Sequence, residues 1–230
     1  KDVFKIPLEY LVYNKYNGRI LSRTQSLETQ NYVIDVETKE GKERIEDLLW
    51  QSNKQRNDTT LKSINDYGQQ KVGIITRDGI IIDGNRRAML LNRGKKYDYF
   101  KAVVLDVTLE ENPLEIEKLE TTYQMGEDEK VGYNATEKYI KSKLLYKKLT
   151  QKTYSSDPNK HKPDSKIIDK IAGWMGIDSS EVLKYLNTME VMDEYLNFLE
   201  YDGIYTQLDK REDQFLNLTK WLKTFYGEAS

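Results

Sequence analysis

The feature that most constrains the fold is the segment 80–94, where an apolar run meets a glycine turn and then a helical pattern. The three consecutive isoleucines at 80–82 favour a strand that is buried on both faces. Gly84 permits a sharp turn directly after Asp83, and Gly94 is a typical helix stop. The segment therefore predicts a short strand, a tight turn and a short helix.

The start of this helix has the composition of a phosphate-binding turn. The first N–H groups of a helix are unpaired and lie at the positive end of its dipole, so they attract anions. Arg86 and Arg87 add permanent charges whose forked donors match phosphate oxygens. We interpret the turn as a site for the phosphates of a nucleotide. The alternative is an ordinary Asp-Gly turn before a helix with exposed arginines, which many proteins have without binding phosphate.

The composition excludes several classes of protein. The chain of 230 residues contains no cysteine, which excludes disulfides, thiolate metal sites and cysteine catalysis. No apolar run reaches the roughly 18 residues of a membrane span, and residues 1–4 lack the apolar core of a signal peptide, so we expect a cytoplasmic protein without a membrane partner. The net charge of −2 argues against a polycation made for nucleic acid. The single histidine, His161, is expected in a loop.

The first half of the chain is expected to be a mixed α+β domain. Strands are predicted at 4–8, 72–76, 79–82 and 100–107, and the Asp78-Gly79 pair between the middle two indicates a hairpin. Helices are predicted at 41–49, 60–67 and 112–123, with the polar residues 52–59 as a connection. This order is typical of a small sheet covered by helices.

The second half is expected to be entirely helical. Asn134 is a typical cap for a helix that runs to residue 149, and further helices are predicted at 165–175, 178–188, 190–201 and 210–226. The stretch 154–165 contains two prolines and is the best candidate for a linker. We therefore predict an α+β domain at 1–110, a helical connector at 111–153 and a helical domain at 154–230.

Residues 168–186 have the spacing of a helix-turn-helix. Ala172 is small where two helices would cross, and Gly176 makes the turn four residues later. If this pair binds DNA, the candidate contact residues are Ser179, Ser180, Lys184, Lys166 and Lys170. The second helix also carries Glu181, which is unfavourable beside a polyanion. A role in packing or protein contact is therefore left open.

Taken together, these segments resemble the ParB/sulfiredoxin superfamily. Its N-terminal domain has a helix, a hairpin, a G-x-R-R turn and a helix in the order found here around residues 63–91. Pro7-Leu8 and the loop 14–19 resemble the opening strand and the arginine-bearing loop of that domain. The helix-turn-helix after a helical connector has the order seen in ParB chromosome-partition proteins. The resemblance covers residues 3–190 and implies a small mixed sheet with helices, followed by an all-α helix-turn-helix region.

The resemblance also implies a nucleotide site. In ParB relatives the G-x-R-R turn holds the triphosphate of CTP with magnesium, so the phosphate clamp here would be Gly84, Asn85, Arg86 and Arg87. Arg19 lies in the loop that resembles the arginine-bearing loop and is a further candidate for phosphate contact. The Glu-Asn-x-x-Arg helix of the relatives corresponds to residues 120–124, where only Glu120 is retained.

Departures from the family pattern leave the nucleotide and the activity open. Relatives that bind cytosine carry a Gly-x-x-Gln-Pro segment before the hairpin strand, whereas Gly68 is followed here by Gln69-Gln70-Lys71. Both CTP and ATP therefore remain candidates. Sulfiredoxin uses a cysteine in the turn where this chain has Asn85, which excludes sulfinic-acid reduction. Other relatives are kinases or belong to defence systems.

Any catalysis would be phosphoryl transfer, which depends on positioning and on neutralising charge. Asp83 and Glu120 are the candidates to hold magnesium or to orient the attacking oxygen, although Asp83 also fits a plain turn-forming residue. Three hypotheses follow. The chain is a ParB-like nucleotide switch that binds DNA, hydrolyses slowly and closes as a homodimer; or it is an NTPase or kinase of this fold; or it is a non-catalytic adaptor that contacts a protein.

Overall fold

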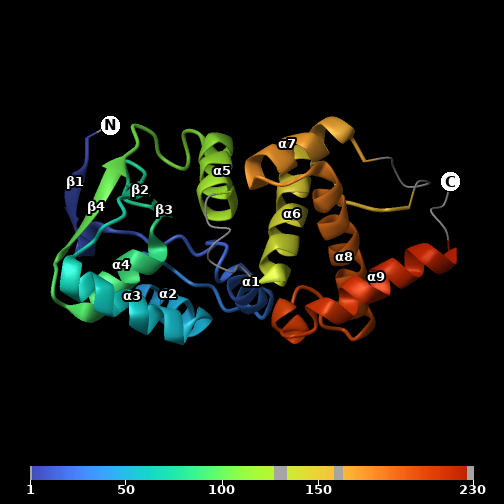
Figure 1. The fold of residues 1–230 in the computed structure, drawn as a ribbon, viewed down its shortest axis with the longest axis horizontal. Coiled ribbons are helices and arrows are strands. Elements are labelled where there is room, and N and C mark those ends of the chain that lie inside the picture. The colour runs from blue at the N-terminus through green and yellow to red at the C-terminus, as the bar shows by residue number, and fades with distance from the viewer. Residues whose placement is uncertain (1, 127–133, 158–162, 227–230) are drawn as a thin grey trace. The chain divides into compact units, whose positions relative to one another are not determined.

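The computed structural model describes residues 2–126, 134–157 and 163–226, which form two compact units (Figure 1). Unit 1 comprises Lys1–Ile20 and Val33–Tyr123, and unit 2 comprises Leu21–Tyr32 and Gln124–Ser230. The chain therefore leaves unit 1 after residue 20 and returns to it at residue 33. His161 and the middle of the predicted linker at 154–165 lie outside the described residues.

Unit 1 contains a four-stranded sheet, which confirms the predicted α+β fold. Its strands are β1 (Phe4–Pro7), β2 (Gly73–Ile75), β3 (Ile81–Asp83) and β4 (Tyr99–Val104), in the order β1-β4-β2-β3. β1 pairs antiparallel with β4, β2 pairs parallel with β4, and β2 and β3 form the predicted antiparallel hairpin. The sheet is therefore mixed, and β3 is at its edge, where the chain turns directly into the next helix.

Helices cover this sheet in unit 1. They are α2 (Lys39–Ser52), α3 (Lys54–Tyr67), α4 (Asn85–Gly94) and α5 (Pro113–Thr121). α2 and α3 both pack against α4, and α5 packs against β3. The fully buried side chains of this core come from strands and helices alike and include Ile45, Leu49, Ile81, Leu90 and Phe100. The burial of these apolar groups holds α4 between the sheet, which it contacts through β4, and helices α2 and α3.

The predicted polar connection at 52–59 is wrong. α2 continues to Ser52, and α3 begins already at Lys54. The single residue between them, Asn53, accepts a hydrogen bond at its side chain from the N–H of Arg56. An asparagine in this position satisfies an otherwise unpaired N–H group, so a new helix can begin at once within a polar sequence.

The described part of unit 2 is built from helices. These are α1 (Leu21–Thr29), α6 (Ala135–Thr150), α7 (Ser165–Met175), α8 (Ser179–Phe198) and α9 (Glu212–Tyr226). α6, α7 and α8 pack against one another and share an apolar core (Figure 1). α1 contacts α6, where the N–H and hydroxyl of Ser22 donate to the buried carboxylate of Glu137 at 2.8 and 2.6 Å. The predicted all-α region is confirmed.

Two details of unit 2 differ from the sequence prediction. The helices predicted at 178–188 and 190–201 are one continuous helix, α8, because no glycine or proline interrupts the chain between Ser179 and Phe198. The sequence analysis did not predict α1. Its mean hydropathy is low, and its stability comes from contacts with α6 and the 3-10 turn Tyr205–Leu208.

Among the helices of the described chain, none combines the length and the apolar character that crossing a bilayer would require.

Candidate functional site

The predicted turn lies between β3 and α4, and its shape depends on Gly84. This residue has φ 110° and ψ 13°, a left-handed conformation that side chains rarely adopt. A Cβ atom at Gly84 would lie 2.6 Å from Cζ of the buried Phe100 ring. The backbone therefore passes directly over an aromatic ring, and only glycine fits. The turn delivers the first N–H groups of a ten-residue helix, α4, to one point.

Arg87 ties the turn to the hairpin. Its guanidinium donates to the carbonyl oxygens of Lys71 and Val72 at 2.5 and 3.2 Å and to Oδ2 of Asp83 at 2.6 Å. The side chains of Arg87 and Asp83 are only 16% and 13% exposed, so solvent screens this ion pair little. Asp83, a predicted catalytic residue, therefore neutralises Arg87 in the structure and helps to hold the turn closed.

Arg86 lies against α3. Its Nε donates to Oδ1 of Asn57 at 2.5 Å, and its Nη2 donates to Oγ1 of Thr60 at 3.3 Å. Both of these partners are neutral. The buried Asn57 is fixed in turn by donating to the carbonyls of Leu49 and Trp50. Arg86 is therefore held in a defined position beside the start of α4, and neither Asn57 nor Thr60 neutralises its charge.

Asn85 joins two parts of unit 1 that are distant in the sequence. Its side chain is buried, accepts from the N–H of Asn14 at 2.9 Å and donates to the carbonyl of Ile81 at 3.0 Å. The first of these bonds spans 71 residues. It holds Asn14, the first residue of the loop 14–19 that carries the half-buried Arg19, at the start of α4. The side chain of Asn85 therefore positions the turn, and its phosphate contact would come from the main chain.

Glu120 is buried near the end of α5, the helix that packs against β3. The neighbouring Thr121 is fully buried, and its Oγ1 has no hydrogen-bond partner among the described residues. A short π-helical stretch, Thr122–Gly126, follows directly, and such stretches are frequent near functional sites. Glu120 is therefore on the element that supports the strand leading into the turn.

The residues proposed for DNA contact lie on α7 and α8, which are joined through Gly176 in a left-handed conformation. Oγ of Ser179 donates to Asp169 at 2.5 Å, and the ammonium of Lys184 lies 3.1 Å from Glu181. These two candidates are thus already bonded to acidic groups of the same helix pair. The other three, which are exposed, are Ser180, Lys166 and Lys170.

The sequence analysis missed the residues that hold the turn in place. Asn57 was assigned to a connection. Asn14 was placed in the loop 14–19, but no role was given to Asn14 itself. The signal that could have found Asn57 is Asn53, a cap residue that starts a helix and brings Asn57 and Thr60 onto successive turns of its first half. No local pattern could have shown that Asn14 and Asn85 meet, because that contact depends on the fold.

Comparisons with known proteins bear on the fold. No protein-family model matches the sequence, and none of the curated proteins is significantly similar to it. Among solved structures, a Pnob8-like ParB-N domain has a TM-score of 0.51 and 11% identity over 98% of this chain and 83% of that one. The C-terminally truncated chromosome-partitioning protein ParB from Caulobacter crescentus, complexed with CTP-gamma-S, has a TM-score of 0.33 and 15% identity over 96% of this chain and 93% of that one. On the first of these likenesses, the chain has a ParB-like fold.

Proposed function

We propose that the chain binds the phosphates of a nucleoside triphosphate at the Gly84 turn of its ParB-like fold. The observation that carries the proposal is the set of groups at this turn that can attract an anion. They are the first amides of α4 and the guanidinium of Arg86, and Asn85 also anchors Asn14, the first residue of the loop that carries Arg19. Gly84 supplies the left-handed backbone conformation that turns the chain from β3 into α4.

We infer that the two arginines have different roles. Arg87 is already paired with Asp83, so its main contribution is to hold the turn. Arg86 is the second residue of α4 and donates to oxygens of Asn57 and Thr60, so its side chain begins beside the amides that would bind the phosphate. We infer that Arg86 is the principal phosphate ligand and Arg19 the second.

The side chains of this unit fit a phosphate better than they fit a resident magnesium ion. Asp83 is engaged by Arg87, and in the part of the chain that the structure describes no group of three acidic or histidine side chains is placed so that it could hold a metal ion. Magnesium commonly enters such sites with the nucleotide, held by one or two carboxylates and the phosphates themselves. Glu120 and Asp83 are the carboxylates of the proposal, and no step is assigned to the metal.

Calorimetric titration with CTP, ATP and GTP, each with magnesium, tests the proposal. We expect one nucleotide to bind and Arg86→Ala to weaken it about tenfold to a hundredfold, because a hydrogen bond to a charged group contributes about 1.5–3 kcal/mol. Arg93→Ala is the matched control, since Arg93 is in the last turn of α4, where it pairs with Asp47. Phosphate release measured in the same samples shows whether the nucleotide is hydrolysed, and light scattering shows whether it closes a homodimer.

If no nucleotide binds, the proposal is wrong and the chain acts as an adaptor for another protein. Arg86→Ala also removes a donor from the buried Asn57, so its unfolding temperature is measured in parallel. Arg86→Lys keeps the charge and part of this bonding. It should retain more affinity than the alanine variant if charge at this position matters.

DNA association is the second part of the proposed function, and the exposed lysines of α7 favour it. Lys166 and Lys170 lie on the helix that precedes the Gly176 turn. Fluorescence anisotropy with duplex DNA across salt concentrations should show affinity that falls as salt rises. The Lys166→Ala/Lys170→Ala double variant should lower the salt slope by about two, one for each phosphate contact. Affinity independent of salt would speak against this role.

A further inference from the structure

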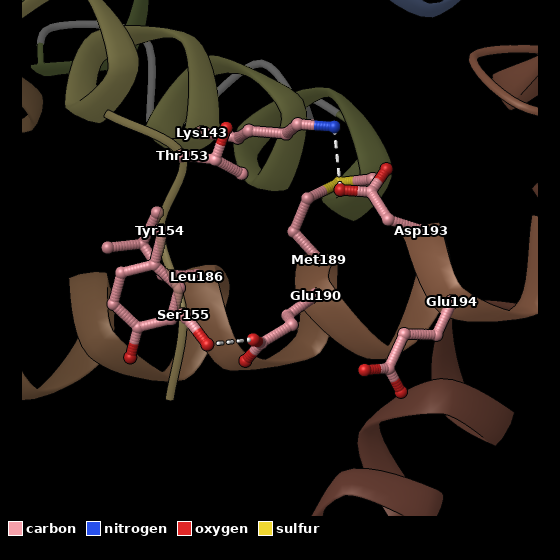
Figure 2. Close-up of a pocket in the computed structure, with 9 residues that line it drawn as sticks. All are labelled: Lys143, Thr153, Tyr154, Ser155, Leu186, Met189, Glu190, Asp193 and Glu194. Atoms are coloured by element: carbon pink, nitrogen blue, oxygen red, sulfur yellow. Dashed lines mark hydrogen bonds and ion pairs between the residues drawn. The ribbon is translucent and has the colours of Figure 1, made fainter. Parts of the chain in front are cut away.

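Unit 2 contains a cavity that is independent of the Gly84 turn. It has a volume of about 300 Å³ and lies between α6, α8 and the extended segment that follows α6 (Figure 2). Its lining residues are Lys143, Thr153, Tyr154, Ser155, Leu186, Met189, Glu190, Asp193 and Glu194. This volume is at the lower end of the range for small-molecule sites, roughly 300–1,000 Å³.

The base of the cavity is apolar. Leu186 and Met189 are each only 1% exposed and come from successive turns of α8. The hydroxyl of Tyr154 donates to Oδ1 of Asn187 at 2.6 Å, so the phenol makes its polar contact with α8 and its ring forms part of the wall (Figure 2). A ligand that fills this space must therefore present hydrocarbon to the base.

The charged groups around the cavity are predominantly negative. The lining contains three carboxylates from α8, those of Glu190, Asp193 and Glu194, and one ammonium group, that of Lys143. Lys143 lies 2.6 Å from Asp193 and donates to the hydroxyl of Tyr205 at 3.0 Å. Burial opposes its charge, but Tyr205 and Asp193 outweigh this effect and the pKa of Lys143 is raised. The Lys143–Asp193 pair is thus internally balanced, and among the described residues no cation pairs with Glu190 or Glu194.

Of the two remaining carboxylates, that of Glu190 is already oriented. Glu190 accepts from the hydroxyl of Ser155 at 2.9 Å and from the N–H of Ser156 at 2.9 Å, which fixes it at the mouth of the cavity (Figure 2). Glu194 is one helical turn further along α8 and is exposed. The rim therefore offers two neighbouring anionic acceptors above an apolar base.

We propose that this cavity binds an alkylguanidinium group, which is the chemistry of an arginine side chain. The planar guanidinium has forked donors that can reach Glu190 and Glu194 together, and its hydrocarbon stem can lie on Leu186 and Met189. An ammonium group matches the charge but offers a point contact in place of a fork. The inference does not depend on nucleotide binding in unit 1.

Three probes of similar shape test the chemistry: n-butylguanidine, n-butylamine and the neutral n-butylurea. The readout is the NMR signal of the Met189 methyl group in the full chain, assigned with Met189→Leu. We expect n-butylguanidine to shift this signal saturably and to bind at least about tenfold more tightly than n-butylurea, which lacks the charge. Equal binding of the urea, equal binding of the amine, or no saturable shift with the guanidine would overturn the proposal.

Two variants and a control locate the site. Glu194→Gln should weaken n-butylguanidine about tenfold by removing one charged acceptor, and Thr153→Trp should block the cavity mouth without changing any charge. Glu200→Gln, which makes the same charge change beyond the end of α8, should have no effect. Wild-type affinity in both site variants would overturn the assignment. A capped Gly-Arg-Gly peptide separates the sources: if it binds, the ligand is a protein side chain, and if only n-butylguanidine binds, it is a free guanidine.

Discussion

Two of the glycine turns, at Gly84 in unit 1 and at Gly176 in unit 2, each lead into a helix but are held in different ways. Around Gly84 the polar side chains bond over long distances, as Asn85 does to Asn14 across 71 residues. Around Gly176 they bond locally, as Ser179 does to Asp169 across 10 residues. The Gly84 turn is therefore held by a bond from a distant part of unit 1, whereas the Gly176 turn is held by a bond within its own helix pair.

This difference predicts unequal responses to the same kind of substitution. Gly84→Val should destabilise unit 1 by roughly 3–5 kcal/mol, because valine is strained in this left-handed backbone conformation and its side chain would also clash with Phe100. Gly176→Ala, at φ 67°, should cost about 1 kcal/mol, since the conformation is strained but forms a regular helix end. Urea unfolding measures both values. Equal losses would remove the distinction between the turns.

The pH dependence of the unfolding free energy tests unit 2 separately, through the buried carboxyl of Glu137. Burial raises the pKa of Glu137 to about 7 from its usual 4.5. The folded state thus favours the protonated carboxyl, and the stability this contributes is present below about pH 4.5 and is lost as the pH rises through about 7. The wild type should therefore lose about 3 kcal/mol relative to Glu137→Gln between about pH 4.5 and pH 8. If the difference in unfolding free energy between the wild type and Glu137→Gln stayed the same at all pH values, this prediction would be wrong.

Asn85→Ala tests the long-range bonds directly. The substitution leaves the N–H of Asn14 and the carbonyl of Ile81 without the partner that the structure gives them, and should cost about 2 kcal/mol. It should also release the loop that carries Arg19, so nucleotide affinity should fall even though the side chain makes no phosphate contact. Hydrogen exchange at Asn14 measures the release. Unchanged protection there would show that other contacts hold the loop.

Ser179→Ala is the local counterpart and should have the smallest effect. Its hydroxyl bonds to the exposed Asp169, and water can replace that bond, so the change in unfolding free energy should stay within about 0.5 kcal/mol. The same substitution frees Asp169 to repel DNA phosphates. A loss of DNA affinity without a loss of stability would show that the helix pair is a surface for binding and not only for packing.

The same contrast explains what the sequence could predict. The sheet, the hairpin and most helices follow from apolar periodicity, caps and glycines, which are local signals. The short strand, the Gly84 turn and α4 were predicted because Ile81 marks the strand, Gly84 marks the turn and Gly94 marks the end of the helix. Helix α1 was missed because its burial depends on Glu137, more than a hundred residues away.

The candidate site was predicted in its residues but not in its bonding. Arg86 and Arg87 look equivalent in the sequence, yet one lies against neutral groups of α3 and the other is paired with Asp83. This difference arises because Asn57 and Asp83 approach from different elements, and no spacing rule contains that information. The cavity beside Glu190 was not predicted, since its lining comes from three separated segments.

The excursion of residues 21–32 into unit 2 has a consequence for biosynthesis. During translation α1 leaves the ribosome long before α6 is made, so Ser22 has no carboxylate to bond to until Glu137 emerges. Unit 1 must therefore fold around a segment whose own partner is still missing. A single cut in the chain therefore cannot separate the two units. A truncated version that retains residues 1–123 would carry the segment of α1 without its packing partners, exposed to chaperones and proteases.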